Sequence, residues 1–91
     1  MPVSIQARVD AQREYFSQGH TLPVAARLDA LKRLKRALIQ MEGEINAALK
    51  ADLGKSASES YLCETGMVLS EINHMLRHVR AYARPRRVRT P

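Results

Sequence analysis

The chain has 91 residues, which suits one small domain, and its single cysteine excludes an internal disulfide framework. It has no uninterrupted apolar run of about 18 residues, so we expect no membrane span. Its N-terminus lacks the basic-then-apolar pattern of a signal peptide, and we therefore expect a cytoplasmic protein.

The formal net charge of +6 comes from one end of the chain. Up to Ile72, nine Lys and Arg residues balance nine Asp and Glu residues, and no acid follows Glu71. The excess lies in Arg77, Arg80, Arg84, Arg86, Arg87 and Arg89. This distribution describes a balanced body with a basic C-terminal tail, not a basic fold of the kind that binds nucleic acid.

Residues 4–18 are predicted to form the first helix, because Ser4 is a suitable N-cap and Gly19 a suitable C-terminal stop. Its apolar side, with Val9 and Phe16, is thin, so this helix should lean on another part of the protein. Residues 19–23 form the connection, and Pro23 stands near the start of the next helix, where its missing N–H does no harm.

The second predicted helix spans residues 23–41 and is amphipathic. Apolar residues recur at spacings of three and four: Val24, Leu28, Leu31, Leu34, Leu38 and Met41. The basic residues between them are Arg27, Lys32, Arg33, Lys35 and Arg36. We interpret this charge run as a solvated face in preference to a specific anionic site.

Residues 42–44 break the apolar pattern, and a shorter helix is predicted over residues 44–53. The residues expected to face inward are Ile45, Ala48 and Leu49. Gly54 is the expected left-handed cap, after which Lys55 leads into the last helix. No strand pattern appears before Val88, and no internal repeat is visible.

The dominant element is a helix predicted over residues 57–84, roughly 40 Å long at about 1.5 Å per residue. Ser56 and Glu59 have the spacing of a capping box, and Pro85 ends the helix by biasing Arg84 away from helical dihedrals. Gly66 costs about 1 kcal/mol relative to Ala, and indicates close packing by a neighbour or a mild bend.

Apolar residues of this helix return every seven residues in three columns. The columns are Leu62, Leu69, Leu76 and Ala83; Tyr61, Val68, Met75 and Tyr82; and Thr65, Ile72 and Val79. This stripe is wider than two short helices can cover, so it should pack against a larger body or a second copy. We therefore predict self-association through the helix from Ser56 to Arg84.

The search for chemistry finds no complete site. His74 and His78 share a helical face at a spacing of four, but no Asp, Glu or Cys stands beside them to complete a metal site, and two partly exposed histidines are the better interpretation. Cys63 has no basic partner nearby in sequence, which favours a small semi-buried residue over a nucleophile. The isolated glycines form no phosphate-binding turn. We predict no catalytic, cofactor-binding or metal residues in this chain.

The connections between the helices carry a recognisable pattern. In order, it reads R-x-x-F-x-x-G-x-T, a leucine-rich helix, E-I-x-x-A-L-x-x-D-L-G-K-S, E-x-x-x-V-x-x-E-I and R-V-R-T-P. The residues that carry it are Arg13, Phe16, Gly19, Thr21, Arg27, Leu28, Leu31, Glu44, Ile45, Ala48, Leu49, Asp52, Leu53, Gly54, Lys55, Ser56, Glu64, Val68, Glu71, Ile72, Arg87, Val88, Arg89, Thr90 and Pro91. The ordered set resembles the N-terminal helical segment of NAD(P)-dependent aldehyde dehydrogenases, in their class-three-like branch.

This resemblance implies a fragment of a larger α/β enzyme, with an all-α fold of about four helices in a hairpin or small bundle. Residues 1–84 would be the helical segment, and residues 85–91 a basic extended tail leading into a Rossmann-type cofactor domain. The family's glycine-rich loop, its catalytic cysteine in a G-Q-x-C context and its general-base glutamate have no counterparts here. We therefore assign neither role to Cys63, Glu64 or Glu71. NAD or NADP would bind the parent enzyme, not these residues.

Three functions are open at this point. The first is the N-terminal segment of an enzyme that oxidises aldehydes to carboxylic acids, with no catalysis of its own and a role in packing and oligomerisation. The second is a stand-alone helical protein-interaction module that uses the apolar stripe. The third is a nucleic-acid binder that uses the arginine tail, which is weaker because no aromatic or polar residues accompany the arginines to read bases.

Overall fold

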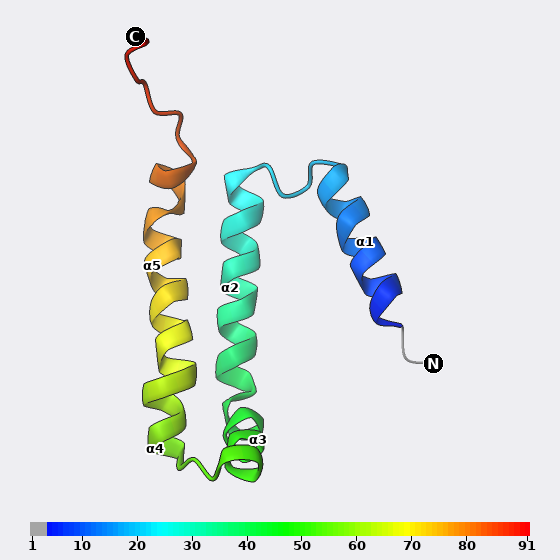
Figure 1. The fold of residues 1–91 in the computed structure, drawn as a ribbon, viewed down its shortest axis with the longest axis vertical. Coiled ribbons are helices and arrows are strands. Elements are labelled where there is room, and N and C mark those ends of the chain that lie inside the picture. Colours follow the sequence, from blue (N-terminus) through cyan, green and yellow to red (C-terminus); the bar gives the residue numbers. More distant parts are fainter. Residues whose placement is uncertain (1–3) are drawn as a thin grey trace.

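The computed structural model describes residues 4–91, and helices joined by short loops make up most of this part of the chain (Figure 1). The elements are α1 (Ile5–Ser17), α2 (Val24–Gln40), α3 (Glu42–Leu53), α4 (Ala57–Ser60), η1 (Tyr61–Thr65) and α5 (Gly66–Ala83). No strand occurs within residues 4–91, and the tail after Pro85 has no regular structure. The predicted all-α fold is confirmed.

Two long helical rods lie side by side and run in opposite directions. α2 packs along α5, α3 folds back at the end where α2 finishes, and α1 stands apart at the other end (Figure 1). The radius of gyration is 17.6 Å, whereas a compact domain of this length has about 12 Å. The protein is therefore a helical hairpin with an outlying first helix, open on several sides.

The helix starts follow the predicted caps. Ser4 Oγ accepts a hydrogen bond from the N–H of Ala7 at 3.1 Å, and Ser56 Oγ accepts one from the N–H of Glu59 at 3.2 Å. Each serine has extended backbone dihedrals, as an N-cap requires. Both helix starts are thus specified locally, by side chains that satisfy otherwise free backbone donors.

The helix ends also follow the sequence. Gly19 and Gly54 have positive φ angles of 81° and 68°, so each reverses the chain in a conformation that costs other residues energy. Arg84 is extended (φ −71°, ψ 140°), because Pro85 disfavours the helical conformation in the residue before it.

The predicted break over residues 42–44 is wrong, because the chain turns at one residue. Met41 has φ −96° and ψ 8°; its N–H donates to Ala37 O, and its own carbonyl accepts from the N–H of Ile45, each at 2.9 Å. α3 therefore begins at Glu42, two residues earlier than predicted. Gly43 fits within its first turn, where acidic Glu42 and Glu44 also suit the helix dipole.

The last helix is continuous from Ala57 to Ala83 but is not uniformly α-helical, as the prediction assumed. Residues Tyr61–Thr65 form a π-helical turn, and the N–H of Gly66 donates to the carbonyl of Tyr61, five residues back. Such a turn inserts one extra residue into the helix. The heptad columns therefore do not continue in register across it.

Only one of the three predicted columns is buried. Thr65, Ile72 and Val79 are 5%, 5% and 7% exposed, and α5, which carries Ile72 and Val79, packs along α2. Ser60 of α4 is fully buried, and α4 packs against α3. On α2, the inward residues Val24, Leu28, Leu31 and Leu38 are half-buried. Because α2 and α5 form a single layer of two helices, no second layer covers the rest of their apolar side chains.

Three residues predicted to face inward are exposed for this reason. Leu34 and Met41 of the α2 stripe are 50% and 48% exposed, and Ala48 of α3 is also on the surface. Ile45 and Leu49 are half-buried, as expected. Among the described residues, no helix has the length and apolar content needed to cross a membrane.

Candidate docking surface

The long helix carries several exposed apolar side chains, which we call together the open face. It consists of the exposed apolar residues of the segment Ala57–Ala83: Tyr61, Leu62, Met67, Val68 and Tyr82. Their exposed fractions run from 45% for Val68 to 70% for Leu62. Large apolar side chains this exposed along one helix are unusual for a monomer and typical of an interaction site.

The total exposed area reflects the open architecture of the whole chain. The chain exposes 7902 Å², whereas a folded monomer of 10.3 kDa exposes about 5,400 Å². The excess of about 2,500 Å² is larger than the roughly 800 Å² that each partner buries in a standard interface. This excess is spread over the chain and includes α1 and the tail, where Ile5, Phe16 and Val88 are also exposed.

The π-helical turn shapes one end of the open face. It brings Tyr61 and Leu62 beside Gly66 and Met67, and these residues line a shallow hollow of about 350 Å³ with Ser70 and Glu71 at its edge. A Cβ atom on Gly66 would stand 2.3 Å from the carbonyl oxygen of Tyr61. Glycine is thus required by the helix's own backbone, not by a neighbouring element.

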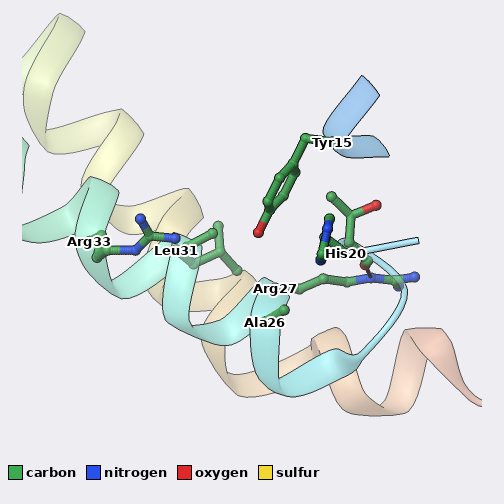
Figure 2. A pocket seen from close by; sticks show the side chains of 8 residues that line it. Tyr15, His20, Ala26, Arg27, Leu31 and Arg33 are labelled. Carbon is green, nitrogen blue, oxygen red and sulfur yellow. Dashed lines mark hydrogen bonds between the residues drawn. The ribbon is translucent and has the colours of Figure 1, made fainter. Parts of the chain in front are cut away.

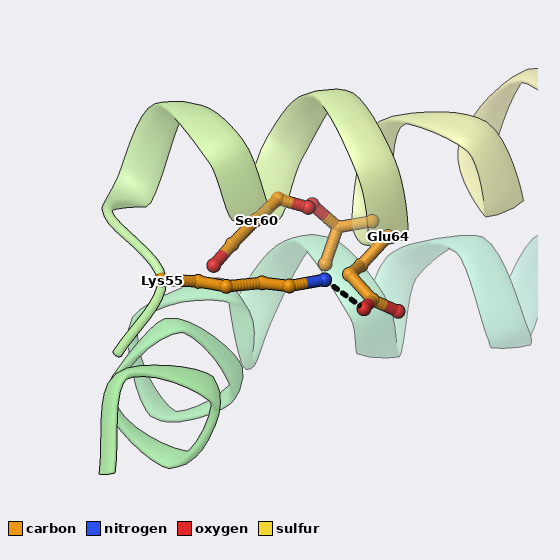
Figure 3. A network of polar contacts seen from close by, with 4 residues as sticks. Lys55, Ser60 and Glu64 are labelled. Atoms are coloured by element: carbon orange, nitrogen blue, oxygen red, sulfur yellow. Dashed lines mark hydrogen bonds and ion pairs between the residues drawn. The ribbon is translucent and has the colours of Figure 1, made fainter. Parts of the chain in front are cut away.

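An ion pair ties the loop after α3 to the long helix. Lys55 Nζ lies 2.6 Å from Glu64 Oε1, beside buried Ser60 (Figure 3). The hydrogen bond to Glu64 raises the pKa of Lys55. Both residues belong to the pattern described in the sequence, but their pairing across nine positions was not predicted.

A second unpredicted contact ties the loop before α2. Arg27 Nε donates to the carbonyl oxygen of Thr21 at 2.7 Å, and the Tyr15 ring stacks on His20 with centroids 4.6 Å apart. These residues line a hollow of about 320 Å³ between α1 and α2 (Figure 2). Thr21 and Arg27, like Lys55 and Glu64, belong to the sequence pattern that resembles aldehyde dehydrogenases. Their membership in that pattern was the sequence signal that could have suggested the two contacts.

The two histidines of α5 lie together. The rings of His74 and His78 stack with centroids 4.2 Å apart, and both side chains are half-buried. The sequence prediction of two partly exposed histidines is confirmed. It missed Tyr82, whose hydroxyl lies 2.9 Å from His74 Nε2. His74 and Tyr82 are eight residues apart, about two helical turns, and this spacing was the signal in the sequence that could have suggested the contact.

Cys63 is exposed, so its predicted semi-buried position is wrong. The buried residues of this stretch are Ser60 and Thr65, and Cys63 lies outside that buried side. In the described part of the chain, no three His, Cys, Asp or Glu residues gather in one place. The geometry therefore offers surfaces for packing more readily than a reaction centre.

Known proteins similar to this chain are dehydrogenases that act on aldehydes. The chain is 35% identical over 86 residues to a 4,4'-diapolycopene-4,4'-dial dehydrogenase of Cytobacillus firmus, a match that covers 94% of this chain and 19% of that protein. It is 36% identical over 72 residues to an aldehyde dehydrogenase family 3 member A2 of Rattus norvegicus, covering 79% and 15%. It is 33% identical over 75 residues to a dimeric NADP-preferring aldehyde dehydrogenase of Canis lupus familiaris, covering 82% and 17%.

The chain thus spans about a fifth or less of the length of these relatives. No protein-family model matches it, and no solved structure matches it significantly. The similarity nevertheless extends over most of the chain and includes several dehydrogenases from different organisms. The chain belongs to the aldehyde dehydrogenase family, in which it corresponds to an N-terminal helical region like that of the class-three members.

Proposed function

We propose that this helical region serves an NAD(P)-dependent aldehyde dehydrogenase as a packing element, and that the open face is the surface by which it docks on the rest of the enzyme. The observation that carries the proposal is the exposed apolar surface of Tyr61, Leu62, Met67, Val68 and Tyr82 on one helix. The whole enzyme would oxidise an aldehyde to a carboxylic acid with NAD or NADP in the cytoplasm. These 91 residues would supply no catalytic group.

The arrangement of the hairpin supports a docking role. The Ser56 cap defines the start of the long helix, and the Lys55 to Glu64 ion pair fixes the loop that leads into it. These contacts are local, so they hold the long helix in position while its open face stays uncovered. A preorganised apolar face loses less conformational entropy on docking than a flexible one.

The same face accounts for the predicted self-association of the chain. Burial of apolar surface contributes about 25 cal/mol per Å², so even 400 Å² of the open face on each copy gives a driving force of about 20 kcal/mol before the costs of association. A second copy is the available apolar partner for the purified chain. A stand-alone interaction module would use the same surface, but the relationship to dehydrogenases favours the first function.

An activity assay tests the catalytic part of the proposal. The purified chain is incubated with an aliphatic or aromatic aldehyde and with NAD or NADP, and reduced cofactor is followed by absorbance. We expect no aldehyde-dependent formation of NADH or NADPH, because no described residue cluster provides a nucleophile with a base. Aldehyde-dependent turnover that survives repeated purification would contradict the proposal.

A further inference from the structure

Basic side chains of α2 surround two apolar residues, one from each long helix, on one side of the hairpin. Lys32, Lys35 and Arg36 line a shallow hollow of about 420 Å³ together with Ile39 of α2 and Leu76 of α5. Because α2 and α5 run side by side, residues of both helices that line one hollow lie on the same side of the pair (Figure 1). We call these five residues the basic face. It shares no residue with the open face.

The cations of the basic face form no ion pair in the described part of the chain. Within residues 4–91 the ion pairs join Arg33 to Asp29 and Lys55 to Glu64. Asp29 is the only acid of α2, and its Oδ2 lies 3.0 Å from Arg33 Nε. Glu71 is the only acid of α5, and it lines the hollow of the open face instead. The basic face therefore keeps a net positive charge that an anionic partner can neutralise.

The positive charge continues beyond the basic face along α5. Arg80 follows Leu76 by four residues, about one helical turn, so it stands on the same side of that helix. The exposed tail then adds arginines and no acid: Arg84, Arg86, Arg87 and Arg89. A partner that contacts the basic face can thus also meet the cations of α5 and the tail.

Two features favour an anionic lipid surface over nucleic acid. Ile39 is 53% exposed among the cations, and apolar side chains flanked by Lys and Arg suit insertion at the headgroup boundary of a bilayer. The molecule is also flat, with extents of 55 × 36 × 25 Å, so both long helices can contact a plane together. The basic face itself contains no aromatic side chain on which bases could stack.

We propose that the basic face binds the surface of a bilayer that contains anionic phospholipid, with its cations at the level of the phosphate groups and Ile39 between the headgroups. Each Lys or Arg near such a surface strengthens binding about fivefold. This attraction is screened by salt, so binding weakens as the ionic strength rises. A solvated face without a ligand, as the sequence alone indicates for α2, is the alternative that the experiment distinguishes.

Cosedimentation of the untagged chain with vesicles tests the proposal. The vesicles contain phosphatidylcholine with or without about one quarter phosphatidylglycerol. We expect binding to the anionic vesicles only, and at least about tenfold weaker binding when Lys32→Gln and Arg36→Gln are combined, equal to about 1.4 kcal/mol. The matched control combines Arg8→Gln with Arg13→Gln, which removes the same charge from exposed positions of α1 and should weaken binding less than about threefold.

Ile39→Gln separates a bilayer from other polyanions. It should weaken binding to anionic vesicles several-fold and leave binding to heparin unchanged, because only the bilayer offers an apolar region. Circular dichroism should show the same helix content in every variant, since Lys32, Arg36 and Ile39 are exposed. The proposal is overturned if the chain does not bind anionic vesicles, if the two double variants bind them equally, or if Ile39→Gln binds vesicles like the wild type. Tighter binding to duplex DNA than to the vesicles would also overturn it.

Discussion

Gly66→Ala should destabilise this protein, although the same change stabilises most helices. In an ordinary exposed helix, alanine is favoured over glycine by about 1 kcal/mol. At position 66 the new Cβ would stand 2.3 Å from the carbonyl oxygen of Tyr61 and 3.2 Å from Cε1 of its ring, where ordinary contacts are 3.4–4 Å. The carbonyl moves only with the backbone, so relief requires distortion or loss of the π-helical turn.

The magnitude follows from these two opposing effects. Overpacking costs about 1–3 kcal/mol, and we take the upper end because a backbone atom is struck. Subtracting the gain in helix propensity leaves a net loss of about 2 kcal/mol, or about 8–16 °C in melting temperature for a domain of this size. Loss of the turn would also change the register between buried Ser60 of α4, which packs on α3, and the buried residues of α5.

Thermal and urea unfolding followed by far-UV circular dichroism, at one fixed protein concentration, measures the effect. Gly43→Ala is the matched control, because a Cβ there meets nothing within 4 Å and the residue lies in the first turn of α3. This control should gain up to about 1 kcal/mol. If Gly66→Ala is as stable as Gly43→Ala, the π-helical turn is not a constraint on this sequence.

Two further predictions concern the packing and the ion pair. Ile72→Ala should lower the free energy of unfolding by about 2–5 kcal/mol, because Ile72 is 5% exposed on the helix that packs along α2. Val88→Ala in the exposed tail, outside the open face, should change it by less than about 0.5 kcal/mol. Equal effects of the two substitutions in urea titrations would contradict the assigned core. The pKa of Lys55 is raised by Glu64, so the pair should contribute stability below the ordinary lysine value of about 10.4 and lose it as the pH rises through the raised pKa. Unfolding above about pH 10 should therefore show a steeper loss of stability for the wild type than for Glu64→Gln, and parallel curves would show that the pair does not contribute.

The sequence predicted the elements whose signals are local. Ser4, Ser56, Gly19, Gly54 and Pro85 each act on backbone groups within a few residues, and all of the predicted starts and stops at these residues appear in the structure. The π-helical turn was not predicted, because a single extra residue leaves no periodic trace and glycine has several explanations in a helix. The sequence pattern thus predicted where the helices lie more securely than which residues share a face along them.

Burial was harder to predict than helicity, because it depends on how many layers pack together. The heptad analysis found three apolar columns on the long helix but did not indicate that only the column of Thr65, Ile72 and Val79 would be fully buried, with the other two half-buried or exposed. The exposure of Leu34 has the same cause: a single partner helix covers one side only. The contact of Arg27 with the loop carbonyl of Thr21 required a chain path that no local rule provides.

Sedimentation equilibrium is the most direct test of the open face as a docking surface. The wild-type chain should associate as its concentration rises, whereas Val68→Glu should be helical by circular dichroism and remain monomeric. Val88→Glu is the matched control, since this valine is exposed in the tail and outside the open face, and it should associate like the wild type. A well-folded wild-type monomer at the highest concentration, or equal association of the Val68→Glu and Val88→Glu variants, would contradict the account.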